Sequence, residues 1–146
     1  MRTLLTVFTL FMLASFLSPV LASENQAESD SKPVFTVTYF FSEPRCKTCR
    51  TIESLTKETV EAAFADELRE GQLAFRLVDT DQEENRHFIE DFQLITKSVV
   101  VTEEKNGHVI RFKILQKVWE LVHNPGAFQE YITDEVRTSM TAPTHE

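Results

Sequence analysis

Residues 34–49, VFTVTYFFSEPRCKTC, decide the fold of this chain. The first eight of them are β-branched or aromatic at almost every position, which predicts a buried central strand. The next four residues, SEPR, predict a turn. Cys46 and Cys49 follow at the start of an amphipathic helical pattern. The stretch therefore predicts a strand, a pair of cysteines and a helix in direct succession.

The rest of the chain continues this alternation of strand and helix patterns. Apolar residues recur at helical spacing after Cys46, and Gly71 is a suitable left-handed cap for that helix. Asn106 and Gly107 supply the positive φ angles that a tight hairpin needs. The predicted elements are a strand over 34–41, a helix from 46 to 71, a strand over 73–78, a helix over 83–92, strands over 97–102 and 108–114, and helices over 115–137.

This order predicts an α/β fold with a mixed four-stranded sheet flanked by helices. The first two crossovers are helical, so we expect right-handed parallel connections there. The hairpin at Asn106 and Gly107 makes the last two strands antiparallel. We find no internal repeat and no second domain boundary.

The ends of the chain differ from this central domain in composition. Residues 1–22 carry one charge, Arg2, followed by an apolar run and small residues up to Ala22, which is the order of a secretory signal peptide. We predict a signal peptide over 1–22, a flexible leader over 23–32, a domain over 33–138 and a disordered tail over 139–146. Such a protein would be periplasmic or secreted in a bacterium. The alternative is an uncleaved membrane anchor, because the apolar run with its flank approaches the roughly 20 residues that span a bilayer.

Composition excludes several classes of function. The chain has 146 residues, 42% of them hydrophobic and 12 of them Phe, which is enough for a packed core. The formal net charge is −8 and the sequence shows no clustered Lys and Arg face of the kind that binds phosphates, so we expect no nucleic-acid partner. Only three glycines are present and no phosphate-binding or nucleotide-binding motif is found, so we expect no cofactor.

The cysteine pair carries the chemistry that this sequence predicts. A helix amino end presents free N–H groups and about half a positive charge, which stabilise a thiolate at Cys46. Three neighbouring cations, Arg45, Lys47 and Arg50, favour the same charged form. We therefore predict that Cys46 is the exposed, acidic nucleophile and that Cys49, one turn further, is the buried resolving thiol.

Other interpretations of the pair stay open. Two thiolates can bind a soft metal ion such as copper(I), or a metalloid, although the sequence provides no clear metal site. The four histidines are scattered without ligand spacing, at His87, His108, His123 and His145. The pair can also form an inert local bridge, or be incidental to a structural subunit of a larger complex.

Around the segment from Arg45 to Glu53, which holds Cys46 and Cys49, the chain resembles the thioredoxin superfamily. More narrowly, it resembles the nitrophenyl compound nitroreductase subunit ArsF family of small bacterial proteins. The resemblance covers about 34–137. It implies a thioredoxin-like fold, an exchange of electrons with a disulfide or dithiol partner protein, and an electron-delivery role in a reductase complex that acts on nitroaromatic compounds. The stretches that carry it are 39–41, 45–53, 64–68, 96–100 and 117–121.

Departures from ordinary thioredoxins concern the surroundings of the dithiol. Thioredoxins have Trp before the first cysteine and Gly-Pro between the two, whereas this chain has Arg45 and Lys47-Thr48. They also have a cis-proline before the third strand of the domain, whereas residues 95–98 (ITKS) contain none. We therefore expect a different partner-binding groove. Lys97 lies in this 95–98 segment. We expect it either to face the dithiol as a further cation or to be an exposed lysine at the start of a strand.

Overall fold

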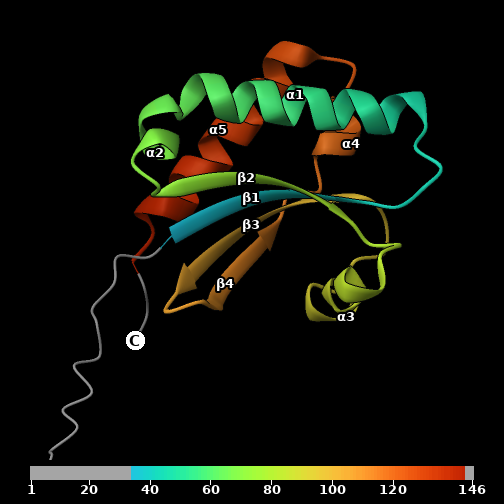
Figure 1. Cartoon of the computed structure of the whole chain (residues 1–146). Helices are drawn as coiled ribbons and strands as arrows, with labels where there is room; N and C mark the ends of the chain where they lie inside the picture. The colour runs from blue at the N-terminus through green and yellow to red at the C-terminus, as the bar shows by residue number, and fades with distance from the viewer. Residues whose placement is uncertain (1–33, 144–146) are drawn as a thin grey trace, which may run out of the picture.

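The computed structural model describes residues 34–143, in which helices pack around a four-stranded sheet (Figure 1). The predicted signal peptide and leader, and residues 144–146 of the predicted tail, lie outside the described residues, so that division of the chain stays a prediction. No helix within 34–143 has the length and apolarity needed to cross a membrane. The elements are β1 (Val34–Phe41), α1 (Lys47–Ala63), α2 (Ala65–Arg69), β2 (Leu73–Asp79), the 3₁₀ turn η1 (Glu83–Asn85), α3 (His87–Asp91), β3 (Ser98–Lys105), β4 (His108–Ile114), α4 (Val118–Leu121) and α5 (Pro125–Thr141).

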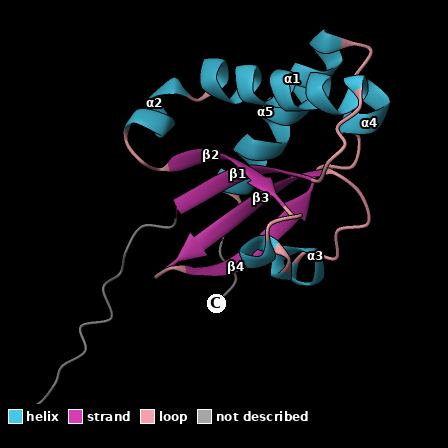
Figure 2. Ribbon diagram, turned by 45° about the vertical axis from the view of Figure 1, so that its right-hand side comes forward, coloured by secondary structure: helices cyan, strands magenta, loops and turns pink. Residues whose placement is uncertain are grey.

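The sheet has the strand order β2-β1-β3-β4. β1 pairs with β2 in parallel, from Phe35 opposite Leu73 to Phe41 opposite Asp79. β3 is antiparallel to β1, and β4 is antiparallel to β3. Helices lie on both faces of this sheet (Figure 2). The predicted mixed four-stranded sheet flanked by helices is therefore confirmed, and the first crossover is parallel as predicted.

The predicted direction of the second crossover is wrong, because β3 runs antiparallel to β1. A parallel connection would have to return along the whole sheet, and a strand of eight residues is about 26 Å long. The helix in this connection, α3, has only five residues, which gives a length of about 7.5 Å. The 80–97 connection folds into η1 and α3 near one end of the sheet, and the chain enters β3 at the same end at which β2 stops.

The helical layer covers the two sheet faces unequally. Figures 1 and 2 place α1, α2, α4 and α5 on one face and α3 alone near one end of the other. Alternate residues of β1, Phe35, Val37 and Tyr39, are buried in the large core under α1 and α5. Phe40 points to the opposite face and packs in a small cluster with Phe92 and Val100. The alternation explains why almost every residue of β1 is apolar.

Three helical boundaries differ from those predicted. The helix predicted up to Gly71 is interrupted at Phe64, whose backbone leaves the helical region (φ −132°, ψ 34°) while its ring is buried in the core. The helix predicted over 83–92 is split into η1 and α3. α5 continues to Thr141, three residues into the predicted tail, and the Arg111 guanidinium donates to the Ser139 carbonyl (3.0 Å). Both local turn predictions are confirmed by positive φ angles, at Gly71 (71°) and at Asn106 and Gly107 (54° and 78°).

Candidate functional site

The two cysteines lie at the carboxyl end of β1, where the chain enters α1, and they form a disulfide. Their Cα atoms are 5.2 Å apart. Cys46 is the N-cap residue of α1, and the Cys49 amide N–H donates to its Sγ (3.2 Å). Cys46 is exposed, whereas Cys49 is only 4% exposed. The expected placement of the first sulfur, exposed at the amino end of a helix, is what the structure shows.

Sulfur at an N-cap position takes the place of the oxygen that Ser or Asp supplies in most helices. The first four N–H groups of a helix have no partner within it, so a group that accepts there satisfies one of them. The Sγ of Cys46 accepts such a hydrogen bond in the disulfide form. After reduction, a thiolate at the same atom accepts more strongly because it carries a full negative charge.

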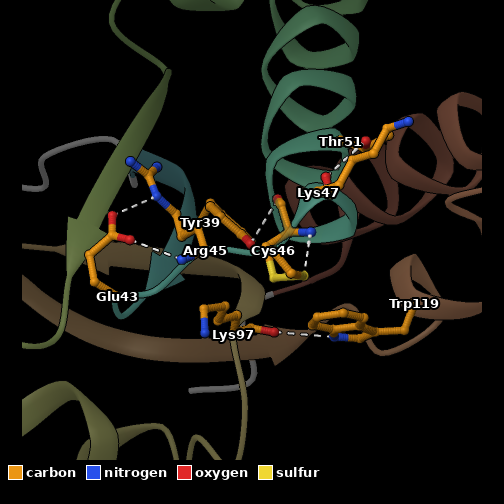
Figure 3. Close-up of a disulfide and its surroundings, with 9 residues drawn as sticks. Tyr39, Glu43, Arg45, Cys46, Lys47, Thr51, Lys97 and Trp119 are labelled. Carbon is orange, nitrogen blue, oxygen red and sulfur yellow. Dashed lines mark hydrogen bonds and ion pairs between the residues drawn. A yellow bond between two sulfur atoms is a disulfide. The ribbon is translucent and has the colours of Figure 1, made fainter.

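Tyr39, on β1, holds the first turn of α1 against the sheet. Its hydroxyl donates to the Cys49 carbonyl (3.0 Å), and its side chain is completely buried (Figure 3). Burial raises the pKa of Tyr39 to about 12, with a further increase from the negative charge of Glu53 and an opposing effect of Arg45. The sequence analysis missed Tyr39 as a site residue. Its one signal was its position in β1 on the face that points to α1.

Replacing Tyr39 with Phe should destabilise the protein at neutral pH by about 1 kcal/mol, because one buried hydrogen bond is lost. A phenol whose pKa is raised in the folded state stabilises that state fully below the unfolded value of about 10, and this contribution is lost as pH rises toward about 12. The stability difference between wild type and Tyr39→Phe should therefore shrink above pH 10. Urea unfolding at neutral pH and near pH 11 measures it, and an unchanged difference would contradict the role given to this hydroxyl.

Arg45 is held by two carboxylates. Its Nε donates to Glu43 Oε1 (3.0 Å) and its Nη1 to Glu53 Oε2 (2.6 Å), while the guanidinium lies 4.2 Å from the centre of the Phe41 ring. Desolvation lowers the pKa of Arg45, but its hydrogen bonds and charge interactions with Glu43 and Glu53 outweigh this and raise it. The charge of Arg45 is thus compensated locally, and its support of the thiolate stays a prediction.

Lys47 and Arg50 are exposed on the first turn of α1, next to Cys46. Neither makes an ion pair with any residue within 34–143. Together with Thr51, Ser54 and Leu55 they line an open groove of about 410 Å³. These two predicted site residues are therefore brought to the dithiol end of the molecule with their charges uncompensated by the described part of the chain.

Lys97 lies on the loop before β3, beside the dithiol in the close-up (Figure 3). The Trp119 Nε1–H donates to the Lys97 carbonyl (3.2 Å), which ties this loop to α4. Lys97 also lines a cavity of about 320 Å³ under the end of β1, with Phe41 and Ile95 among its walls. The structure places Lys97 near the site, and an effect of its charge on Cys46 stays a prediction.

Among residues 34–143, no group of three or more His, Cys, Asp or Glu side chains is arranged so that it could hold a metal ion. His145 lies outside those residues. The soft-metal or metalloid alternative for the reduced cysteine pair stays a prediction.

The chain is similar to several solved thioredoxins at low sequence identity. No protein-family model matches the chain, and no curated protein matches it. A thioredoxin from Trypanosoma brucei brucei is 19% identical with a TM-score of 0.39, over 74% of this chain and 80% of that one. A thioredoxin from Thermus thermophilus is 15% identical with a TM-score of 0.36, over 64% and 78%. Thioredoxin-2, described as a component of malaria parasite protein secretion machinery, is 18% identical with a TM-score of 0.36, over 64% and 84%.

The strand order, the strand directions and the position of the dithiol between β1 and α1 are those of a thioredoxin-like α/β fold. The narrower resemblance to the ArsF family is not confirmed.

Proposed function

We propose that this chain is an exported thiol–disulfide redox protein that exchanges electrons with a disulfide or dithiol of a partner protein. The observation that carries the proposal is the asymmetry of the pair. The Cys46 sulfur caps α1 and is exposed, while Cys49 is buried and within bonding reach of it. A partner can therefore reach one sulfur only, and the second sulfur is reserved for the resolving step.

In the reducing direction the exchange takes two displacement steps. The Cys46 thiolate attacks one sulfur of the partner disulfide, a Cys46–partner bond forms, and the other partner sulfur leaves as a thiolate. Cys49 then loses its proton to solvent and attacks the Cys46 Sγ, which releases the second partner thiolate. Two electrons pass from the dithiol to the partner, and the Cys46–Cys49 disulfide is restored. The oxidising direction is the reverse of these steps.

The experiment uses the reduced protein with all external reductant removed. Mixed with an equimolar protein disulfide such as insulin, it should release two partner thiols per chain and lose two hydrogens in mass as its own disulfide forms. Absence of both changes at neutral pH, together with no oxidation of a protein dithiol by the disulfide form of the chain, would overturn the redox function.

Export and an electron-delivery role in a reductase complex are the finer parts of the proposal. The order of charge, apolar run and small residues in 1–22 supports export, and the resemblance to the ArsF family supports the complex. Expression of the full chain in a bacterium should yield a periplasmic protein whose amino terminus is Ser23. A protein that stays in the cytoplasm with Met1 intact would contradict export.

A further inference from the structure

The charge around Cys46 is opposite in sign to that of the whole chain. The formal net charge is −8, yet Lys47 and Arg50 are exposed beside the sulfur and have no ion pair within 34–143. Both line the groove of about 410 Å³ that begins at the first turn of α1. Residues three and four apart share a helix face, so these cations and the hydroxyls of Thr51 and Ser54 lie along one side of the helix.

The nearby carboxylates cancel only part of this positive charge. Glu43 and Glu53 are both held by the single Arg45 guanidinium, so this trio keeps one negative charge against the two positive charges of Lys47 and Arg50. Glu58, one turn beyond the groove, accepts a hydrogen bond from the Ser54 hydroxyl (2.6 Å) and lies at the far end from Cys46. The positive end of the groove is therefore the end that adjoins the reactive sulfur.

We propose that this groove binds an acidic segment of the partner protein, next to the partner's disulfide. The inference rests on the proposed redox function and names the partner chemistry of the same site. A carboxylate placed beside Lys47 and Arg50 brings the flanking disulfide over Cys46, and the same two cations stabilise the thiolate that leaves. Repulsion by the acidic remainder of the chain is screened beyond about 10 Å at 0.1 M salt, so the local charges decide the docking.

Three aliphatic disulfides of similar size test this inference: anionic 3,3′-dithiodipropionate, neutral 2-hydroxyethyl disulfide and cationic cystamine. Rate constants for their reaction with the reduced full chain are measured at about 0.1 M salt, where the distant acidic residues are screened and the charges beside Cys46 are not. The ratio of the anionic to the cationic rate constant should fall about fivefold or more in the double variant Lys47→Gln, Arg50→Gln. Any change in the intrinsic nucleophilicity of Cys46 alters both rate constants alike and cancels in this ratio.

A matched control removes two cations elsewhere. Arg69 pairs with Asp66 on α2, and the Arg137 guanidinium lies over the Phe64 ring (5.9 Å to its centre), so both belong to the far end of α1. Phe64 is about 27 Å along the helix from Cys46. The variant Arg69→Gln, Arg137→Gln should leave the ratio unchanged.

These rate constants distinguish a failure of the acidic-segment proposal from a failure of the redox function. An equal ratio in wild type, the groove variant and the control overturns the acidic-segment proposal while leaving the redox function intact, provided the neutral disulfide reacts. No reaction with the neutral disulfide in wild type overturns both. A ratio that falls only in the groove variant, and whose difference disappears at 1 M salt, supports the proposal.

Discussion

Cys46→Ser should abolish disulfide exchange completely, whereas Cys49→Ser should keep the first step and accumulate a mixed disulfide with the partner. The reason is the difference in exposure, since Cys46 is an exposed residue and Cys49 is 4% exposed. Without Cys46 the one remaining thiol is the buried Cys49, because the chain has only these two cysteines. Without Cys49 the mixed disulfide has no resolving thiol.

Non-reducing electrophoresis and intact mass measure the two variants against a protein disulfide in equal amounts. The double variant, with both cysteines replaced, is the control for non-covalent association. Equal trapping by the two single variants would show that both sulfurs are accessible, which contradicts the assignment of roles.

Phe128→Ala should lower the free energy of unfolding by about 3–5 kcal/mol. Phe128 is 0% exposed, and it lies on α5, in the core cluster that α5 shares with α1 and the sheet. Truncation removes a whole ring from this packed layer and leaves a cavity that rigid neighbours cannot fill. Because α1 rests on this layer, the dithiol should lose its support when the layer loosens.

Phe112→Ala is the matched control, because Phe112 carries the same side chain but is 42% exposed, on β4. It should cost clearly less than Phe128→Ala, about 1–2 kcal/mol, since part of its surface already faces water. Urea unfolding followed by the fluorescence of Trp119, the one tryptophan of the chain, measures both. Equal losses in the two variants would contradict the packing described for the α1–α5 layer.

The strand, cysteine pair and helix start that position the site could be predicted from the sequence. β1 spans Val34–Phe41 and β4 spans His108–Ile114, both as predicted, because a nearly continuous apolar run and an alternating run after Asn-Gly are local signals. Exposure of Cys46 and burial of Cys49 also followed from local signals, since Cys46 stands at the N-cap before the first helical turn, whereas Cys49 shares the buried helix face of Ile52, three residues later.

Features set by distant parts of the chain could not be predicted this way. The direction of β3 depends on the path that the 80–97 connection takes across the sheet, which no residue type reveals. The interruption of the first helix at Phe64 depends on the core that receives its ring. The ion pairs of Arg45 and the hydrogen bond from Tyr39 to Cys49 depend on where β1 and α1 meet.

The central claim is that the amino end of α1 makes the Cys46 sulfur anionic in the reduced protein. The most direct measurement is the pKa of Cys46 in the Cys49→Ser variant, from the pH dependence of thiolate absorbance or of alkylation by iodoacetamide, a neutral reagent. We predict a pKa of Cys46 well below the free-thiol value of about 8.5, because helix N–H groups and neighbouring cations stabilise the thiolate. A pKa at or above about 8.5 would contradict the account.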